Sequence, residues 1–535
     1  IIPEKEIRGE RSCYYVVSEI TVQPQEQKEW MIVADVNKNH AAVIELLDKI
    51  KYNQELIKEL LNDVKLGTER LQQLVAAADG IQYSSDILKD SRHYSNVLFN
   101  IMRGGIFDAN YTIEKNDLEK YLQKTNKSVF ENSINILKAL PETFPVFELK
   151  QVAVKSGDPG FKRLATEYLP LKFSRRHGDP SRPWNRFSIN TKNETDGSKI
   201  LDYEGNWRDI FQNWEALACS YPYFLEGMIY RFLDASTFEG YNPYRVTKEG
   251  FDWEVIEPDN PWSYIGYWGD HQVIYLLKLL EIFNRQQPGA IHQLFSESIF
   301  VYANVPYKIK SYTDIVNDPK NTIIFDHDSD RNIRNRMKLM GTDGALLCDS
   351  NNQIYRVNFL EKILATLLSR ISNFVPEGGI WMNTQRPEWN DANNALVGNG
   401  LSMVTLYYLR RFLKFFESLF TTSEANEYEV STELTVFFNE VLSTLEKYSQ
   451  LLNTGINDAD RKNITDELGQ AGSRYRTNIY DHSFFGSKEK LNSNDLKKFT
   501  GIALDFLEHS IRSNKREDGL YHAYNLISYN NTAIK

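Results

Sequence analysis

The chain has 535 residues, of which 41% are apolar and 25% are charged. Its 62 Lys and Arg against 72 Asp and Glu give a net charge of −10, whereas a general nucleic-acid-binding protein needs a net basic surface. No apolar run approaches the roughly 20 residues of a membrane-spanning helix. The three cysteines, Cys13, Cys219 and Cys348, form no CxxC pair and suggest neither a zinc site nor a disulfide framework. We therefore expect a soluble, cytoplasmic protein with neither nucleic-acid nor membrane partners.

Aromatic residues are abundant: 30 Tyr, 29 Phe and 9 Trp make up 13% of the sequence. Aromatic rings fill large hydrophobic cores, and they also cover the apolar faces of sugar rings in binding clefts. Composition alone favours the first interpretation, so the placement of these residues along the chain has to decide between the two.

Residues 1–40 are predicted to be the C-terminal edge of a β domain whose other strands lie upstream. The segments Ser12–Val22 and Trp30–Asp35 are rich in residues that favour strands, and two strands are too few for a stable sheet. From residue 41 to residue 90 the period changes, and apolar residues such as Leu46, Ile50 and Leu60 recur at helical spacing. We interpret residues 41–90 as a linker of one long helix or two shorter helices.

Residues 91–535 are predicted to form a mainly α domain. Apolar residues at helical spacing predict helices at Trp207–Leu217, His271–Phe283, Phe359–Phe374, Leu401–Phe420, Val430–Leu451 and Leu496–Ile511. Strand signals are few and short, which argues against alternating α/β folds. The absence of a repeat of fixed period argues against a solenoid, so an α-helical bundle or an α/α barrel is expected.

Four polar segments between these helices are crowded with Trp, Asn, Asp, Arg and Gly. The first, residues 174–187, carries four Arg and one His against a single Asp, and its two Pro and one Gly exclude a helix. Guanidinium groups bind phosphate through paired hydrogen bonds, but a loop that joins helices by ion pairs explains these charges equally well. The candidate phosphate ligands here are Arg175, Arg176, His177 and Arg182.

The second segment, residues 203–215, predicts a helix with two different faces. The apolar face consists of Trp207, Phe211 and Trp214. The candidate ligands for sugar hydroxyls are Arg208, Asp209 and Gln212. Spacing alone favours a simpler interpretation, in which these side chains and Glu215 form ion pairs on an outer surface.

The third segment, residues 252–272, contains three Trp and two Tyr just before a predicted apolar helix. Asp270 is well placed to be the N-cap of that helix, but capping does not explain the density of aromatic rings. The candidate sugar-binding residues are Trp253, Glu254, Trp268, Asp270 and His271.

The fourth segment, residues 379–394, contains two carboxylates, Glu388 and Asp391, among aromatic and amide side chains. Aromatic neighbours raise the pKa of a carboxyl group until it can donate a proton near neutral pH. Cleavage of a glycosidic bond requires such a donor, because the departing sugar oxygen must be protonated. The candidate substrate-binding residues around these carboxylates are Trp381, Arg386, Trp389 and Asn390. A polar loop that bonds its own backbone is the alternative.

Taken in order, the last three of these segments resemble the inverting glycoside phosphorylases of the cellobiose phosphorylase family, in the six-hairpin glycosidase superfamily, and a further motif lies downstream at residues 518–525. Arg208-Asp-Ile-Phe-Gln-Asn213 is similar to the family's Arg-Asp-x-x-Gln-Asp element, and Glu388-Trp-Asn-Asp391 to its Asp-Trp-Asn-Asp element. Asp518-Gly-Leu-Tyr-His-Ala-Tyr-Asn525 is similar to a region with a late phosphate-binding His. Four features differ from the family. Asn213 replaces an Asp, the basic loop Arg175–Arg186 has no counterpart, Asp270-His271-Gln272 is only loosely similar to the family's acidic sugar-binding loop, and a helical insertion is expected at about Asn110–Tyr168.

The resemblance implies a β-sandwich, a helical linker and an (α/α)6 barrel, which matches the order 1–40, 41–90 and 91–535. It implies that Asp391 is the general acid, that His522 assists phosphate binding, and that inorganic phosphate is a co-substrate with no other cofactor and no metal. The expected partner is a β-linked oligosaccharide, and the chain is compatible with a homodimer.

Two alternatives stay open. An inverting hydrolase on the same barrel needs a second carboxylate as base; Glu388 lies too close to Asp391 in sequence, and Asp209, Glu254 and Asp270 are better placed. A carbohydrate-binding protein without activity would keep the site and lose the chemistry. All three hypotheses require the four segments to meet at one end of the barrel.

Overall fold

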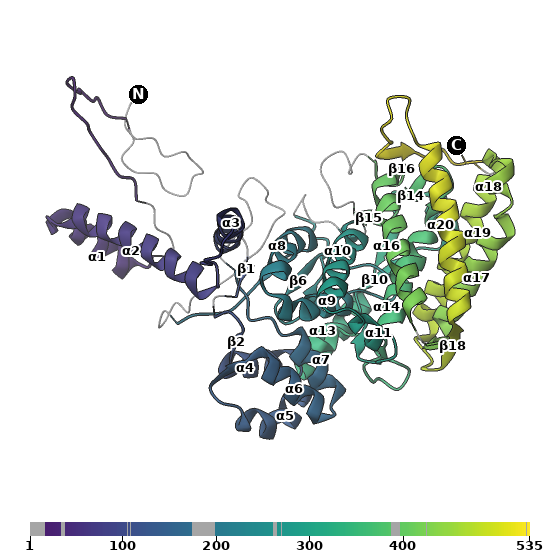
Figure 1. Ribbon diagram of the computed structural model, residues 1–535, viewed down its shortest axis with the longest axis horizontal. Coiled ribbons are helices and arrows are strands. Elements are labelled where there is room, and N and C mark those ends of the chain that lie inside the picture. Colours follow the sequence, from purple (N-terminus) through teal and green to yellow (C-terminus); the bar gives the residue numbers. More distant parts are fainter. Residues whose placement is uncertain are drawn as a thin grey trace. The chain divides into compact units, whose positions relative to one another are not determined.

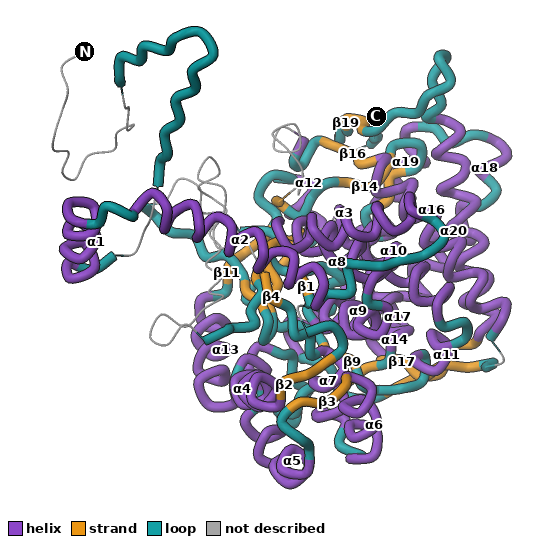
Figure 2. The backbone as a smooth tube through the Cα atoms, turned by 60° about the vertical axis from the view of Figure 1, so that its left-hand side comes forward, coloured by secondary structure: helices purple, strands orange, loops and turns teal. Residues whose placement is uncertain are grey.

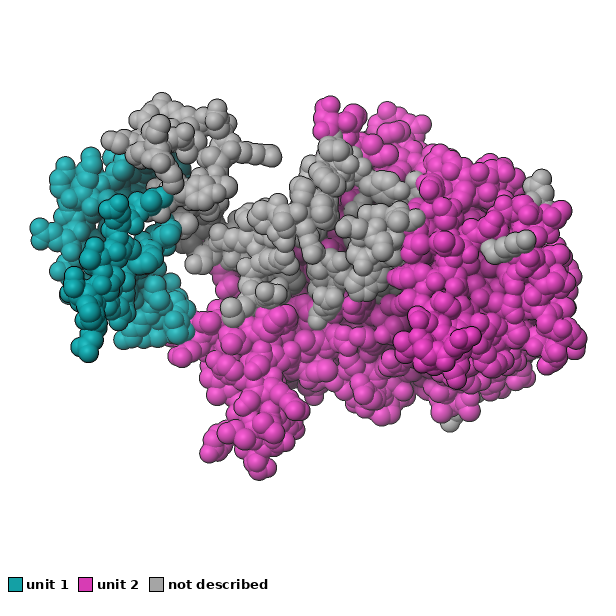
Figure 3. All heavy atoms as spheres, turned by 90° about the horizontal axis from the view of Figure 1, so that it is seen from above, with its two compact units in different colours: residues 1–70 teal, residues 71–535 magenta. Residues whose placement is uncertain are grey.

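The computed structural model describes residues 17–33, 38–103, 105–107, 109–173, 198–259, 265–268, 270–386, 396–423, 425–530 and 532–534. The chain divides into two compact units, Ile1–Arg70 and Leu71–Lys535 (Figure 3). Helix accounts for 57% and strand for 13%, which confirms the predicted mainly α fold. Among the described residues, no helix has the length and apolar character needed to cross a membrane.

The first unit contains α1 (His40–Tyr52) and the beginning of α2 (Leu56–Ala77). The range 41–90 predicted as a helical linker contains these two helices and the first residues of a third, and its role as a linker stays a prediction. The Asn39 side chain caps α1 by accepting a hydrogen bond from the Ala42 amide at 2.9 Å. Residues 17–33 contain a turn and no strand, which differs from the predicted β edge over this range. A strand requires a neighbouring backbone to accept its hydrogen bonds, and residue composition cannot supply one. The rest of the predicted β edge lies outside the described residues.

The second unit contains a row of neighbouring helices in which each packs against the next: α3 (Ile87–Arg103), α8 (Trp207–Ser220), α10 (Asp270–Gln286), α16 (Met403–Thr422) and α20 (Ser493–Ser513). A second set comprises α9 (Leu225–Asp234), α14 (Phe359–Ile371), α17 (Thr432–Tyr448) and α19 (Asp458–His482), and Figure 1 shows α16, α17, α19 and α20 side by side. Every residue of α14 is buried. The second unit is thus mainly helical, and its closure into an α/α barrel stays a prediction.

The helices between these sets are shorter, and several of them belong to one lobe. The remaining helices are α4 (Lys115–Thr125), α5 (Lys127–Ala139), α6 (Val146–Ser156), α7 (Pro159–Glu167), α11 (Ala290–Leu294), α12 (Tyr312–Asn317), α13 (His327–Met340) and α18 (Leu451–Thr454). Helices α4–α7 and the antiparallel pair β2 (Thr112–Glu114) and β3 (Thr143–Pro145) gather in what we call the insertion lobe, residues 112–167 (Figure 2). The predicted helical insertion at Asn110–Tyr168 is therefore present.

The strands are short and pair mostly antiparallel between helices. They are β1 (Gly105–Ile106) with β4 (Lys172–Phe173), β5 (Glu204–Asn206) with β6 (Arg245–Thr247) and β7 (Phe251–Asp252), β8 (Tyr267–Trp268) with β15 (Gln385–Arg386), β9 (Phe300–Val301) with β12 (Arg356–Val357), β10 (Tyr307–Ile309) with β11 (Ile323–Phe325), β13 (Phe374–Val375) with β14 (Gly379–Trp381), β16 (Gly400–Ser402) and β19 (Tyr524–Leu526), and β17 (Glu427–Ser431) with β18 (Lys488–Asn492). These strands explain why three helix bounds differ from the predicted ones. Leu401, Phe374 and Val430 lie in β16, β13 and β17, so the apolar runs extend beyond the helices.

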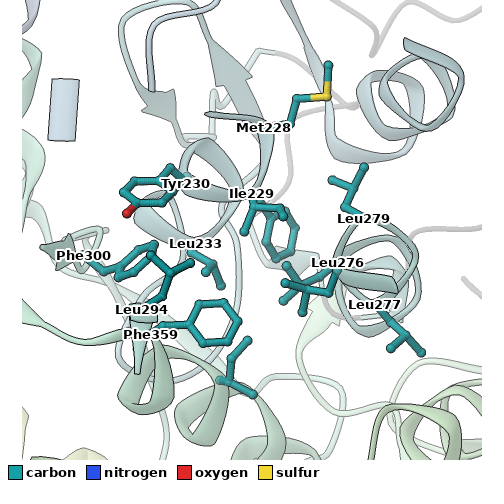
Figure 4. Close-up of a cluster of buried hydrophobic side chains, with 14 of the residues drawn as sticks. Met228, Ile229, Tyr230, Leu233, Leu276, Leu277, Leu279, Leu294, Phe300 and Phe359 are labelled. Carbon is teal, nitrogen blue, oxygen red and sulfur yellow. The ribbon is translucent and has the colours of Figure 1, made fainter. Parts of the chain in front are cut away.

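One continuous apolar core joins the helices of the second unit. Figure 4 shows Met228, Ile229 and Leu233 of α9 among side chains of α10 and the rings of Phe300 and Phe359. Burial of this apolar surface is the main favourable contribution to folding, at about 25 cal/mol per Å².

The sequence patterns did not reveal α19, the longest helix of the unit, because it is polar overall and contains Gly469 and Gly472. These glycines allow close packing: a Cβ on Gly469 would lie 2.1 Å from the Tyr312 ring, and one on Gly472 would lie 2.9 Å from the Ser372 hydroxyl.

We predict opposite effects for two Gly→Ala substitutions in helix interiors. Gly469→Ala forces α19 away from Tyr312 and lowers the free energy of unfolding by about 1–3 kcal/mol. A Cβ on Gly501 of α20 would meet no atom within 4 Å. Because Ala has the higher helix propensity, Gly501→Ala should raise the free energy of unfolding by about 0.5–1 kcal/mol. Thermal unfolding of both variants measures the difference, and equal melting temperatures would contradict the close contact.

Candidate active site

Three neighbouring helices begin at the same end of the second unit. Glu215 of α8 and Lys278 of α10 form an ion pair at 3.0 Å and lie equally far from the first residues of their helices. Gln286 at the end of α10 donates to the carbonyl of Ala218 near the end of α8 at 3.4 Å, so these two helices run in the same direction. Arg411 of α16 pairs with Glu281 of α10 at 2.5 Å, and the His292 ring, just after α10, bonds the Leu419 carbonyl near the end of α16 at 2.9 Å. Helices α8, α10 and α16 are therefore parallel neighbours, and the segments that precede them lie at one end.

Two of the predicted segments are joined by a parallel strand pair. Tyr267 of β8 lies opposite Gln385 of β15, and Trp268 lies opposite Arg386. The Tyr267 amide donates to the Thr384 carbonyl at 3.3 Å. The segments 252–272 and 379–394 thus meet, as the sequence predicted, although more than a hundred residues separate them.

The segment 203–215 is joined to the start of the segment 252–272 by the three-stranded sheet β5–β6–β7. Arg245 of β6 donates to Glu204 of β5 and to Asp252 of β7, both at 2.6 Å, and so ties the three strands together. Strand β5 leads directly into α8, and β7 leads into Trp253, which shares an aromatic cluster with Tyr267. Three of the four predicted segments are therefore brought together.

Many predicted site residues lie beyond what the structure describes. Outside the described residues lie Arg175, Arg176, His177, Arg182, Glu388, Trp389, Asn390 and Asp391. The backbone, but not the side chain, is described for Arg208, Asp209 and Gln212 of α8, Trp268 of β8, Asp270 and His271 of α10, and Arg386 of β15. These residues lie on the first two turns of α8 and α10 and on the paired strands β8 and β15, and their common site stays a prediction.

Two tryptophans predicted to bind sugar are buried and have structural contacts. Trp253 is 4% exposed, donates from Nε1 to Asp330 at 2.9 Å and has the Arg334 guanidinium 4.9 Å from its ring centre. Trp381 is also 4% exposed, donates to the Gly398 carbonyl at 2.9 Å and stacks on Tyr529. Both rings hold the loops together in this structure, which is the core role that composition favoured.

The polar face of α8 contains structural as well as candidate residues. Glu215 pairs with Lys278, as the simpler interpretation of this helix predicted. Asn213, which replaces an Asp of the resembling family, is 6% exposed; it donates to Asn100 Oδ1 and accepts from the Gly105 amide at 3.1 Å. An Asp cannot donate to Asn100, so the amide suits this position.

The structure places Glu254 and His522 differently. Glu254 is half-buried next to β7, and its carbonyl accepts a hydrogen bond from the Tyr307 hydroxyl at 2.5 Å. His522 is exposed near the first turn of α16, where its carbonyl accepts from the Tyr407 hydroxyl at 2.6 Å. Gly400 is the end of β16 that follows the segment 387–395 along the chain, and its partner in β19 is Leu526. His522 precedes β19 and lies beyond the other end of this strand pair. The phosphate-binding role of His522 stays a prediction.

A buried polar layer beneath these strands was missed by the sequence analysis. Glu239 is 4% exposed and accepts from the Tyr480 hydroxyl at 2.8 Å, and burial raises the pKa of its carboxyl group. Tyr241 stacks on Tyr267. The sequence Phe238-Glu-Gly-Tyr-Asn242 could have indicated this layer, because it places a carboxylate and an amide among aromatic residues. Its central Gly240 has a φ of 83°.

Comparison with known proteins supports part of the predicted relationship. Residues 107–170 match the family model Glycoside hydrolase family 149 insertion domain 1. No curated protein matches the chain. The match covers the insertion lobe and indicates a relationship to enzymes that act on glycosidic bonds, but not to the cellobiose phosphorylase family specifically. Among the described residues, no group of three or more His, Cys, Asp and Glu could hold a metal ion.

We predict that Asn213 is structural. Asn213→Ala leaves the Gly105 amide without its acceptor and should lower the free energy of unfolding by about 1–3 kcal/mol. Asn96→Ala is the control, because the Asn96 side chain makes two long hydrogen bonds to the neighbouring helix, at 3.4 and 3.5 Å. Chemical denaturation of both variants gives the difference. An Asn213→Ala protein of unchanged stability would contradict this role.

Proposed function

We propose that the chain cleaves a β-linked oligosaccharide with inversion, by phosphorolysis, with Asp391 as the general acid. The observation that supports this most is the β8–β15 pair, because it joins the segment of Asp270 and His271 to the segment that leads to Asp391. The match of the insertion lobe to a family 149 model adds an independent argument, since that family comprises β-glucan phosphorylases.

In this mechanism the Asp391 carboxylic acid protonates the departing glycosidic oxygen. Inorganic phosphate, held by cationic residues among Arg175, Arg176, His177, Arg182 and His522, attacks the anomeric carbon from the opposite face. One protein carboxylic acid is sufficient, because the phosphate is itself the nucleophile. The products are a shortened oligosaccharide and an α-sugar 1-phosphate.

The second candidate is an inverting hydrolase, which needs a base to activate water about 6.5–9.5 Å from the acid. Glu254 is the described carboxylate that favours this alternative, since it is half-buried and follows directly on a strand of the joined segments. A carbohydrate-binding protein without activity is the third candidate.

We predict that gluco-, manno- or N-acetylglucosamine oligosaccharides yield sugar 1-phosphate only when phosphate is present. Asp391→Asn should lower the rate by at least about 100-fold, because a general acid commonly contributes that much. Asp328→Asn, which changes an exposed carboxylate on α13, is the matched control and should retain full activity.

The products distinguish the three candidates. Release of free sugar without phosphate would contradict phosphorolysis and favour the hydrolase. Binding of oligosaccharide without any product would favour the non-catalytic protein. Full activity of Asp391→Asn would remove Asp391 from the mechanism.

A further inference from the structure

The turn of the β6–β7 hairpin, residues 247–250, is held from inside the protein by one arginine. Arg231 of α9 is 4% exposed and donates from Nη2 to the carbonyls of Thr247 at 2.5 Å, Lys248 at 2.8 Å and Gly250 at 3.2 Å. Its Nη1 donates to Glu167 of the insertion lobe at 2.7 Å. A single guanidinium therefore connects the lobe to three backbone carbonyls of the turn.

A second connection runs from the turn directly to the lobe. Lys248 is almost fully buried, and its ammonium lies 2.7 and 2.8 Å from the two carboxylate oxygens of Asp117 in α4. The same ammonium donates to the Leu201 carbonyl at 2.8 Å. Lys124 of α4 also pairs with Glu249 at 3.3 Å, but that pair is exposed and contributes little.

Five buried ionisable side chains form the junction between the lobe and the helices: Arg163, Glu167, Arg231, Asp234 and Asp343. Arg163 and Arg231 contact the carboxylates of Glu167 and Asp343. Burial and the neighbouring Glu167 raise the pKa of Asp234 well above its usual range. In these ion pairs the guanidiniums of two arginines contact the carboxylates of Glu167 and Asp343. Removing one partner would leave an uncompensated buried charge. The lobe and the helices are therefore joined by directional contacts between buried side chains.

The strands on either side of the turn lead to two predicted sugar-binding segments. Thr247 of β6 lies opposite Glu204 of β5, and β5 continues into the first turn of α8. Strand β7 continues into Trp253 and Glu254. Because Arg245 ties β5, β6 and β7 together, a displacement of the turn moves both segments.

We propose that the insertion lobe positions the sugar-binding segments 203–209 and 252–254 through the β6–β7 hairpin, and that Asp117, Glu167, Arg231 and Lys248 are positioning residues for oligosaccharide binding. The ligand in this inference rests on the proposed function. Its mechanical part, the hold of the lobe on the hairpin, does not.

The test uses the periphery of the junction, because Glu167→Gln leaves buried Arg231 short of a partner and endangers folding. Asp117→Asn removes the charge and one of the two acceptors of the second connection, and Lys248→Met removes the connection itself. The double variant shows whether their effects share one interaction. Lys150→Met is the matched control: Lys150 of the lobe pairs with Glu226 of α9 at 2.8 Å but has no contact with the hairpin.

Hydrogen exchange of the full chain without ligand tests the mechanical part. Amides of residues 245–252 should exchange about tenfold faster in Asp117→Asn and Lys248→Met, while Lys150→Met should match the unchanged protein. Unchanged exchange in the first two variants, or equal acceleration in Lys150→Met, would overturn the inference whether or not the protein is an enzyme.

Steady-state kinetics with oligosaccharide and phosphate test the consequence for the site. Asp117→Asn and Lys248→Met should raise KM for the oligosaccharide by about three- to tenfold while kcat changes by less than about twofold. A fall in kcat of about three- to tenfold with an unchanged KM would overturn the positioning role. If the unchanged protein has no activity on any sugar, the proposed function fails, and the hydrogen-exchange result still decides whether the lobe holds the hairpin.

Discussion

Short backbone ladders determine where the helices of the second unit begin, and the candidate site depends on this constraint. Helices α8 and α16 start at the residue after the ends of β5 and β16, and α10 starts two residues after the end of β8. Strand pairing fixes each helix start to a segment distant in sequence, so the first helical turns are held by backbone hydrogen bonds as well as by side-chain packing. In this way a mainly helical scaffold can present polar residues at one end while the backbone that carries them is restricted in its movement.

Buried charge is the second organising feature. The insertion lobe is joined to the helices by guanidiniums and carboxylates that are almost fully buried, and these also hold the turn of the β6–β7 hairpin. Such groups are costly to desolvate, so an apolar contact would join the lobe more simply. Their directional hydrogen bonds instead fix the backbone of a hairpin that leads to the site.

The sequence predicted the helices with strong apolar periodicity, the helical insertion and the meeting of the segments 252–272 and 379–394. It did not predict α19, because its close packing depends on Gly469 and Gly472 rather than on an apolar stripe. Sequence spacing also could not distinguish a sugar-binding Trp from a structural one: Trp253 and Trp381 are buried through contacts with Asp330 and Gly398. Asn213 looked like a departure from a motif, and its contacts with Asn100 and Gly105 give the reason.

The central claim is that carbohydrate binds at the end where α8, α10 and α16 begin. A crystal structure of Asp391→Asn with oligosaccharide and phosphate tests this most directly. The account predicts a sugar within hydrogen-bonding distance of residues at the start of α8, the start of α10 and β15. A sugar bound only elsewhere, for example on the outer surface of the insertion lobe, would contradict it.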